Sequence, residues 1–175
     1  LDVSKNTALT ILSCADNKLE KLDLTNNTKL QRLYCYSNSL SQLDVTDLTD
    51  LTALSCAFNK LTALDVSKNV KLTELICFNN KIATLDVGSN TELSHLNCSS
   101  NRLEKLDLSA NKKLNNLDCS DNYMVDEDFS YLDKDNMEEC DTENQHNVED
   151  ILIDDDGTWY YTKYGEADET ANKLF

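Results

Sequence analysis

Thiols at a fixed spacing are the most conspicuous reactive groups in this sequence. Six cysteines recur every twenty-one residues, and they are Cys14, Cys35, Cys56, Cys77, Cys98 and Cys119. Thiols can form disulfides or bind zinc. Parallel side chains that point the same way from adjacent strands, however, cannot easily reach the dihedral angle of about 90° that a disulfide needs. A straight file of single thiols also provides no cage of four zinc ligands. We interpret the file as buried, reduced cysteines that act as small apolar residues. We interpret the further spacing to Cys140 as decay of the repeat or as coincidence, because its neighbours do not keep the pattern.

Acid–base chemistry has few candidates. His95 lies one repeat from Glu74 and one repeat from Asn116, which could suggest proton transfer. No serine–histidine–aspartate arrangement can be assembled from the sequence, and three glycines do not form a phosphate-binding loop. We therefore predict a protein that is not an enzyme, with no catalytic residue, no cofactor and no metal ion.

Carboxylates form a second file with the same spacing. Its members are Asp2, Asp23, Asp44, Asp65, Asp86 and Asp107. Each precedes an inward valine or leucine and so points outward, and a serine or threonine usually follows two residues later, with Gly88 as the exception. We interpret these aspartates as acceptors for the nearby hydroxyl and N–H groups that keep the turn tight. A file of calcium sites is the alternative.

The shared spacing shows that the chain consists of repeats. Each unit follows the pattern L-x-x-L-x-C-x-x-N-x-L, with two leucine columns and one asparagine column. The asparagines are Asn17, Asn38, Asn59, Asn80, Asn101 and Asn122. Units of this length bury their apolar face only by stacking on their neighbours, which predicts a solenoid. We expect each asparagine to bond the backbone of its own coil and of the next one, because a turning chain otherwise leaves polar groups unpaired.

Each coil is predicted to be flat, β-rich and almost free of helix. Leu12 and Cys14 are two residues apart and share the inward face of a strand. Leu22 and Leu24 form a similar pair in the second half of the coil. Twenty-one residues leave no room for a returning helix, so stacked coils should pair their strands in parallel at about 4.8 Å.

Charge divides the chain into two parts. Residues 1–122 carry 15 acidic and 13 basic side chains, whereas residues 123–175 carry 17 acidic and 3 basic ones. Such a tail argues against nucleic-acid binding, which needs clustered lysine and arginine. The sequence has no apolar run of eighteen residues and shows no signal peptide, so we predict no membrane span. It begins inside a repeat, which suggests that the natural N-terminal cap is missing.

The end of the chain is predicted to be a separate unit. We place the solenoid at residues 1–125 and an acidic C-terminal cap or tail at residues 126–175. Phe129, Tyr131, Leu132 and Met137 could form a short amphipathic helix that covers the end of the solenoid. Ile151–Ile153 and Thr158–Tyr161 flank an Asp-Gly pair, which predicts a β-hairpin. The aspartates of that turn do not have the spacing of a calcium-binding loop.

Outward side chains of the strands are the candidate binding site. Bulky residues gather on the second and fourth coils, and the third coil between them has small ones, which predicts a shallow trough with aromatic walls. The candidate ligand-binding residues are Arg32, Tyr34, Tyr36, Phe58, Glu74, Ile76, Phe78 and His95. Contiguous exposed apolar surface commonly marks a contact site. The alternatives are an aromatic ladder that only stabilises the sheet, or a surface covered by the missing cap or by the tail.

This pattern resembles the leucine-rich repeats of bacterial internalin-J-type proteins, and related repeats in surface proteins of gut Bacteroidetes and Firmicutes. The resemblance rests on the 21-residue period, the cysteine in place of a core leucine and the L-D-[VL]-[ST] second half, over roughly residues 1–125. It implies that the strand face is concave. It also implies a bacterial surface or secreted module for adhesion, with a protein partner, including a host protein. A glycan ligand, or a spacer for another domain, is the alternative.

Overall fold

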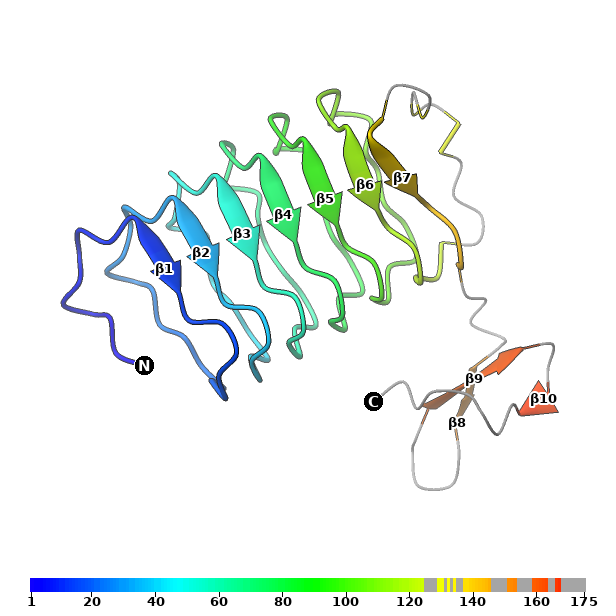
Figure 1. The fold of residues 1–175 in the computed structure, drawn as a ribbon, viewed down its shortest axis with the longest axis horizontal. Coiled ribbons are helices and arrows are strands. Elements are labelled where there is room, and N and C mark those ends of the chain that lie inside the picture. Colours follow the sequence, from blue (N-terminus) through cyan, green and yellow to red (C-terminus); the bar gives the residue numbers. More distant parts are fainter. Residues whose placement is uncertain are drawn as a thin grey trace.

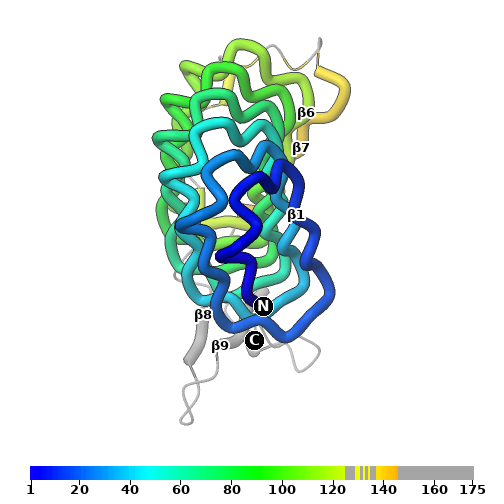
Figure 2. The backbone as a smooth tube through the Cα atoms, turned by 90° about the vertical axis from the view of Figure 1, so that its left-hand side faces the viewer, coloured from blue at the N-terminus to red at the C-terminus, as the bar shows by residue number. Residues whose placement is uncertain are grey.

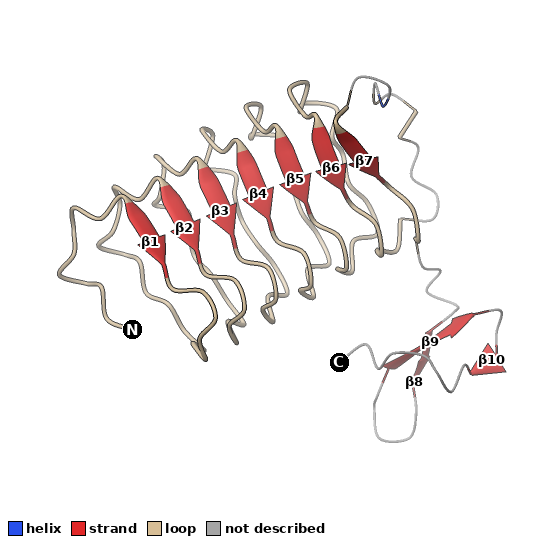
Figure 3. Cartoon of the chain, viewed as in Figure 1, coloured by secondary structure: helices blue, strands red, loops and turns tan. Residues whose placement is uncertain are grey.

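The structure, a computed structural model, describes residues 1–124, 129–130, 132, 134, 137–145, 151–153, 159–163 and 166–167. Successive coils stack into a solenoid, with every strand of the stack on one face and the returning segments on the opposite face (Figures 1 and 3). Figure 2 looks along the stack and shows each coil repeating the path of the one before it. Among the described residues, no helix has the length and hydrophobicity needed to cross a membrane.

A seven-stranded parallel sheet forms that strand face. Its strands, in sequence order, are β1 (Ile11–Ser13), β2 (Arg32–Tyr34), β3 (Ala53–Ser55), β4 (Glu74–Ile76), β5 (His95–Asn97), β6 (Asn116–Asp118) and β7 (Glu139–Asp141). Leu12 pairs with Leu33, and Leu33 with Leu54, so equivalent repeat positions lie side by side. Each strand has only three residues because the chain must turn twice within one coil. The predicted parallel solenoid of 21-residue coils is confirmed.

The core is a stack of aliphatic layers between the two faces. The central leucine of each of the first six strands points inward, as does the cysteine that follows two residues later. The return segments contribute Leu24, Val45, Val66, Val87 and Leu108 from the other side. Because every coil repeats these positions, each layer is covered by the layers above and below it, which is how a thin coil removes its apolar area from water.

The asparagine column binds adjacent coils together, as predicted, but in the opposite direction along the chain. The Nδ2 of Asn59 donates to Cys56 O at 3.1 Å within its own coil and to Cys35 O at 3.0 Å in the preceding coil. Its Oδ1 accepts from Leu40 N at 2.9 Å. The expectation that the bonds go to the next coil is therefore wrong, because the turn directs the side chain back toward the coil already formed.

A second asparagine column was not recognised from the sequence. Its buried members are Asn27, Asn69, Asn90 and Asn111. The Nδ2 of Asn69 donates to Val45 O and Leu48 O, both at 2.9 Å, and so ties the return segment to the preceding coil. Leu48 occupies this position in one coil, and that interruption obscures the pattern. The column satisfies carbonyls on the side of the coil where no β-ladder forms.

The aspartate file forms the predicted turns. Asp23 Oδ1 accepts from Thr25 N at 3.0 Å and from Thr25 Oγ1 at 2.6 Å. Where glycine replaces the hydroxyl residue, Asp86 Oδ1 still accepts from Gly88 N at 2.8 Å. Each carboxylate therefore stabilises the corner at which its own return segment ends.

The sheet continues past the six regular repeats. In β7, Cys140 lies beside Leu117, so it occupies the leucine column and not the column of Cys119. The spacing from Cys119 to Cys140 is thus coincidental, and the last coil is longer, with 23 residues between paired positions such as Asn116 and Glu139. Gln145 takes the place of the ladder asparagine and donates to Cys119 O at 3.0 Å.

Apolar side chains beyond the sixth repeat pack against the core. Phe129 is buried, and Leu132 and Met137 are partly buried against the same cluster. The helix predicted around them falls partly on residues outside the described set, Tyr131 included. The division of the chain at residue 125 stays a prediction about domains, and the sheet itself extends to Asp141.

Three further strands lie near the C-terminus, and they are β8 (Ile151–Ile153), β9 (Trp159–Lys163) and β10 (Glu166–Ala167). Strand β8 pairs antiparallel with β9, with Ile153 beside Trp159. Strand β10 pairs with the other end of β9. The predicted antiparallel pairing of these two runs is confirmed, whereas the Asp-Gly pair between them lies outside the described residues and the role as a cap stays a prediction.

Candidate binding surface

The strand face consists of the outward side chains of β1–β7 and of the residues that directly follow each strand. Backbone register arranges these side chains in rows across the coils. One row runs Arg32, Ala53, Glu74 and His95. Another row contains Tyr34, Ser55 and Ile76. Because the scaffold fixes the backbone, the chemistry of this face is set by which side chain each coil supplies.

Large apolar side chains project from three adjacent coils, the second to the fourth, and we call this set the aromatic patch. Its members are Tyr34, Tyr36, Phe58, Ile76 and Phe78. Tyr36 is 36% exposed and Phe58 is 50% exposed. The sequence placed all of these residues on the outward face, and the register brings the coils that carry them side by side.

The outward side chains of the third coil have little contact with solvent. Ala53, Ser55 and Ala57 are exposed by only 6%, 7% and 2%, although they lie on the outward face of this coil. The trough predicted between the aromatic walls stays a prediction.

Phe58 has a backbone conformation that its side chain does not favour. Its φ angle is +52°, in the left-handed region that L-residues adopt at a cost of about 1–2 kcal/mol. The same conformation recurs once per coil, at Asp16, Ser37, Asn79, Ser100, Asp121 and Asn144. Every other member of this column is polar, and aspartate and asparagine tolerate the conformation best. Phe58 is thus a strained exception on an otherwise regular scaffold.

The ring of Phe58 lies over the next coil. Its centroid is 4.9 Å from that of Phe78, and the two planes meet at 74°, an edge-to-face arrangement. A pair of this kind contributes about 0.5–1.5 kcal/mol, which offsets part of the backbone strain. Half of the Phe58 side chain nevertheless remains in contact with solvent. Phe58 interrupts a column of polar residues, and this interruption is a signal in the sequence that could have identified it.

Charged side chains flank the patch at the start of its strands. Arg32 and Glu74 lie on either side of Ala53. Within the described part of the chain, neither side chain takes part in an ion pair or a side-chain hydrogen bond. His95 lies beside Glu74 in register, but its Nδ1 is 2.9 Å from the hydroxyl of Ser94. The structure does not bring these groups into an acid–base pair.

The fifth to seventh coils present a different surface, which we call the polar network. Asp118 accepts from Asn97 Nδ2 at 3.0 Å and from Ser120 Oγ at 2.6 Å. Asn97 Oδ1 in turn accepts from Ser99 Oγ at 2.8 Å. These side chains satisfy one another across adjacent strands, so this half of the face has many of its hydrogen bonds already formed.

The six thiols of the repeat column are shielded from solvent. All seven cysteines are free, and the six of the repeat column are buried. Burial raises the pKa of the Cys98 thiol well above its usual value, and burial together with nearby Asp118 raises that of Cys119 to about 12. A thiol that stays protonated is a poor nucleophile and a poor metal ligand. Among the described residues, no cluster of three histidine, cysteine, aspartate or glutamate side chains could hold a metal ion.

Comparison with known proteins identifies the fold. Neither a protein-family model nor a curated protein matches the chain. Among solved structures, the functional domain of InlJ from Listeria monocytogenes, which includes a cysteine ladder, matches with 35% identity and a TM-score of 0.61. That match covers 75% of this chain and 39% of InlJ.

Two other bacterial structures are also similar. The internalin InlF of Listeria monocytogenes has 29% identity and a TM-score of 0.65, and the match covers 69% of this chain and 38% of InlF. A leucine-rich-repeat protein of Leptospira interrogans has 27% identity and a TM-score of 0.65, with 69% of this chain and 33% of that protein covered. This chain therefore spans well under half of the length of each relative. The repeats, the parallel register and the buried file of thiols together make it a leucine-rich-repeat protein of the internalin-like type with a cysteine ladder.

Proposed function

We propose that the chain is a non-catalytic adhesin-like module of a bacterial surface or secreted protein, and that it binds a protein partner through the aromatic patch. Host proteins are among the candidate partners. The internalin-like neighbours support a protein-interaction role in general. Solenoids of this kind present a rigid, extended surface, so a partner does not have to order the scaffold when it binds.

The observation that carries this proposal is Phe58. A scaffold selected only for stability would have a polar residue at this left-handed position, as every other coil has. Phe58 instead exposes half of an aromatic ring at a position where its backbone is strained. Strained residues persist where function requires them, and exposed aromatic side chains are frequent anchors of protein interfaces.

Arg32, Glu74 and His95 supply the expected polar rim of such an interface. Arg32 and Glu74 make no side-chain hydrogen bond within the described part of the chain, so their charged groups are available to a partner. Rim charges mainly affect the association rate and the choice of partner, whereas buried aromatic anchors mainly affect dissociation. We therefore expect the patch to supply affinity and these three side chains to supply selectivity.

The test is an array of host proteins and glycans, probed with the wild-type chain and with Phe58→Asn. The substitution removes the ring and suits the left-handed backbone. We expect a protein hit that the variant loses, while the melting temperature stays the same or rises. Ser100→Asn is the matched control, because it makes a similar change in the same column within the polar network, and it should keep binding.

Three outcomes would contradict the proposal that a protein partner binds the aromatic patch. A hit that Phe58→Asn retains would exclude the patch as the contact surface. A hit among glycans alone would favour stacking of sugar rings on the exposed aromatic faces. The absence of any hit, together with a lower melting temperature of the variant, would favour a spacer whose aromatic pair only stabilises the sheet.

A further inference from the structure

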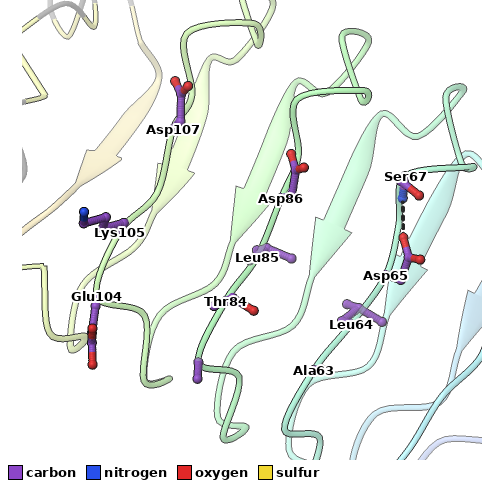
Figure 4. Close-up of a pocket in the computed structure, with 11 residues that line it drawn as sticks. Ala63, Leu64, Asp65, Ser67, Thr84, Leu85, Asp86, Glu104, Lys105 and Asp107 are labelled. Atoms are coloured by element: carbon purple, nitrogen blue, oxygen red, sulfur yellow. Dashed lines mark hydrogen bonds between the residues drawn. The ribbon is translucent and has the colours of Figure 1, made fainter.

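A hollow on the face opposite the strands is not part of the aromatic patch. It has a volume of about 820 Å³ and spans the return segments of three successive coils. Figure 4 shows this back hollow, with Ala63, Thr84 and Lys105 contributed by different coils and the strands of the sheet behind them. A second, smaller hollow of about 400 Å³ continues it toward the N-terminus and shares Ala63 and Asp65.

The back hollow exists because two coils carry short side chains at two consecutive positions where other coils carry long ones. The first and fifth coils carry Glu20-Lys21 and Glu104-Lys105 at these positions. The coils between them that line the hollow carry Thr62-Ala63 and Ala83-Thr84. All of these residues are exposed, so the core does not require the small ones. The flanking coils show that the scaffold accepts a glutamate–lysine pair at the same backbone positions.

Carboxylates line one edge of the back hollow. Asp65, Asp86 and Asp107 come from successive coils, and all three line the cavity. The Oδ1 of each accepts from the backbone N–H two residues later, at 2.9, 2.8 and 2.8 Å respectively. Among the described residues, the hydrogen bonds to each of these carboxylates come from the residue two positions later. Hydrogen bonds from Ser67 and Ser109 lower the pKa of Asp65 and Asp107, so these two carboxylates stay charged at neutral pH.

The arrangement favours a chain of organic cations over a metal ion. Each carboxylate belongs to a different coil, and no three acidic, histidine or cysteine side chains of the described residues are gathered closely enough to hold an ion. Apart from Lys105, the charged residues that line the hollow are acidic. The methyl groups of Ala63 and Ala83 offer apolar surface on which the aliphatic stems of lysine or arginine can pack.

We propose that the back hollow binds an extended, basic polypeptide segment of a partner protein. The segment lies across the return segments, with its lysine or arginine groups bonded to the carboxylates of Asp65, Asp86 and Asp107. Charge-assisted hydrogen bonds of this kind are the stronger ones in proteins. This site is independent of the aromatic patch, so the module has two separate contact faces.

The test uses a blocked eight-residue peptide of alternating arginine and threonine, with fluorescence anisotropy on the full chain at physiological ionic strength. The key variant is Ala83→Glu/Thr84→Lys, which fills the hollow without changing the net charge and copies a pair found in two other coils. We expect the variant to weaken peptide binding by at least about tenfold. Circular dichroism should show an unchanged melting temperature.

A charge comparison separates this site from the acidic tail. Asp65→Asn/Asp86→Asn keeps an oxygen acceptor for each turn but removes two charges at the hollow, and it should weaken binding. Asp2→Asn/Asp23→Asn removes two charges from the same column outside the hollow, and it should leave binding nearly unchanged. Equal binding by the filled variant and the wild type, equal losses in the two aspartate variants, or no binding of the peptide by the wild type would each overturn the proposal.

Discussion

The aromatic patch and the polar network occupy the same sheet and the same backbone, yet they use their outward side chains in opposite ways. In the polar network, Asn97, Asp118 and Ser120 bond to one another, so the surface is largely self-satisfied. In the aromatic patch, Phe58 is strained and half exposed. The backbone of the coils is otherwise equivalent, so the difference lies in the side chains that each coil supplies. This difference supports our proposal that the aromatic patch contacts a partner.

The largest expected effect tests the scaffold that both regions share. Asn80→Ala, beneath the aromatic patch, removes donors to Cys56 O and Cys77 O and the acceptor of Leu61 N. Leaving buried backbone groups without partners should lower the free energy of unfolding by about 3 kcal/mol or more. Asn101→Ala, beneath the polar network, should cost a similar amount in urea denaturation. Clearly unequal losses of unfolding free energy would show that the asparagine ladder does not stabilise the two regions equally.

The next effect measures the stability of the polar network. Asp118→Ala removes the acceptor for Asn97 Nδ2, Ser120 N and Ser120 Oγ. Because these groups are only partly buried and can bond to water, we expect a loss of about 1–2 kcal/mol in the free energy of unfolding. Chemical denaturation measures it. A loss below about 0.5 kcal/mol, typical of surface substitutions, would mean that the network does not stabilise the sheet.

The strain at Phe58 predicts a smaller difference between two variants. Phe58→Asn and Phe58→Ala both remove the ring contact with Phe78, but only asparagine suits the left-handed backbone. The asparagine variant should therefore be more stable than the alanine variant by about 1 kcal/mol or slightly less. Thermal unfolding of both variants gives the comparison. Equal stability would remove the argument that Phe58 is strained.

The smallest effect is a pH dependence common to both regions. The hydroxyl and N–H of Thr25 lower the pKa of Asp23 in the folded state. The stabilisation is therefore present above the unfolded carboxyl pKa and is lost as the pH falls through the lower folded value. Asp23→Asn should lower the melting temperature slightly at neutral pH, because the amide keeps a hydrogen-bond acceptor but loses the stabilisation supplied by the charged carboxylate. Between about pH 5 and pH 2, the melting temperature of the variant should fall less steeply than that of the wild type. An identical decline in both proteins would show that this turn is not coupled to stability.

Periodic positions were the most predictable part of the molecule. The leucine, cysteine and ladder asparagine columns predicted the parallel register and the buried thiols, and these are confirmed. The aspartate turns and the hairpin of β8 and β9 also follow from short local patterns. Such features are predictable because each depends on residues a few positions apart or one period apart.

Features that depend on side-chain size or on a change of period were harder to predict. The burial of Ala53 and Ala57 was not predicted, because it depends on how three neighbouring coils pack together. The seventh strand was missed because its coil is longer and puts Cys140 into the leucine column. Gln145, which replaces an asparagine there, has no counterpart in the repeat pattern.

The sequence by itself determined the solenoid, since a repeated unit that cannot bury its own apolar face has to stack. It also determined which side chains point outward, because strand geometry alternates. Only the tertiary structure decided that the outward side chains of the third coil are buried, that Phe58 is strained, and that a hollow opens on the return segments beside Asp65, Asp86 and Asp107. These three features arise from contacts between neighbouring coils and from backbone angles, which depend on the packing of the whole stack.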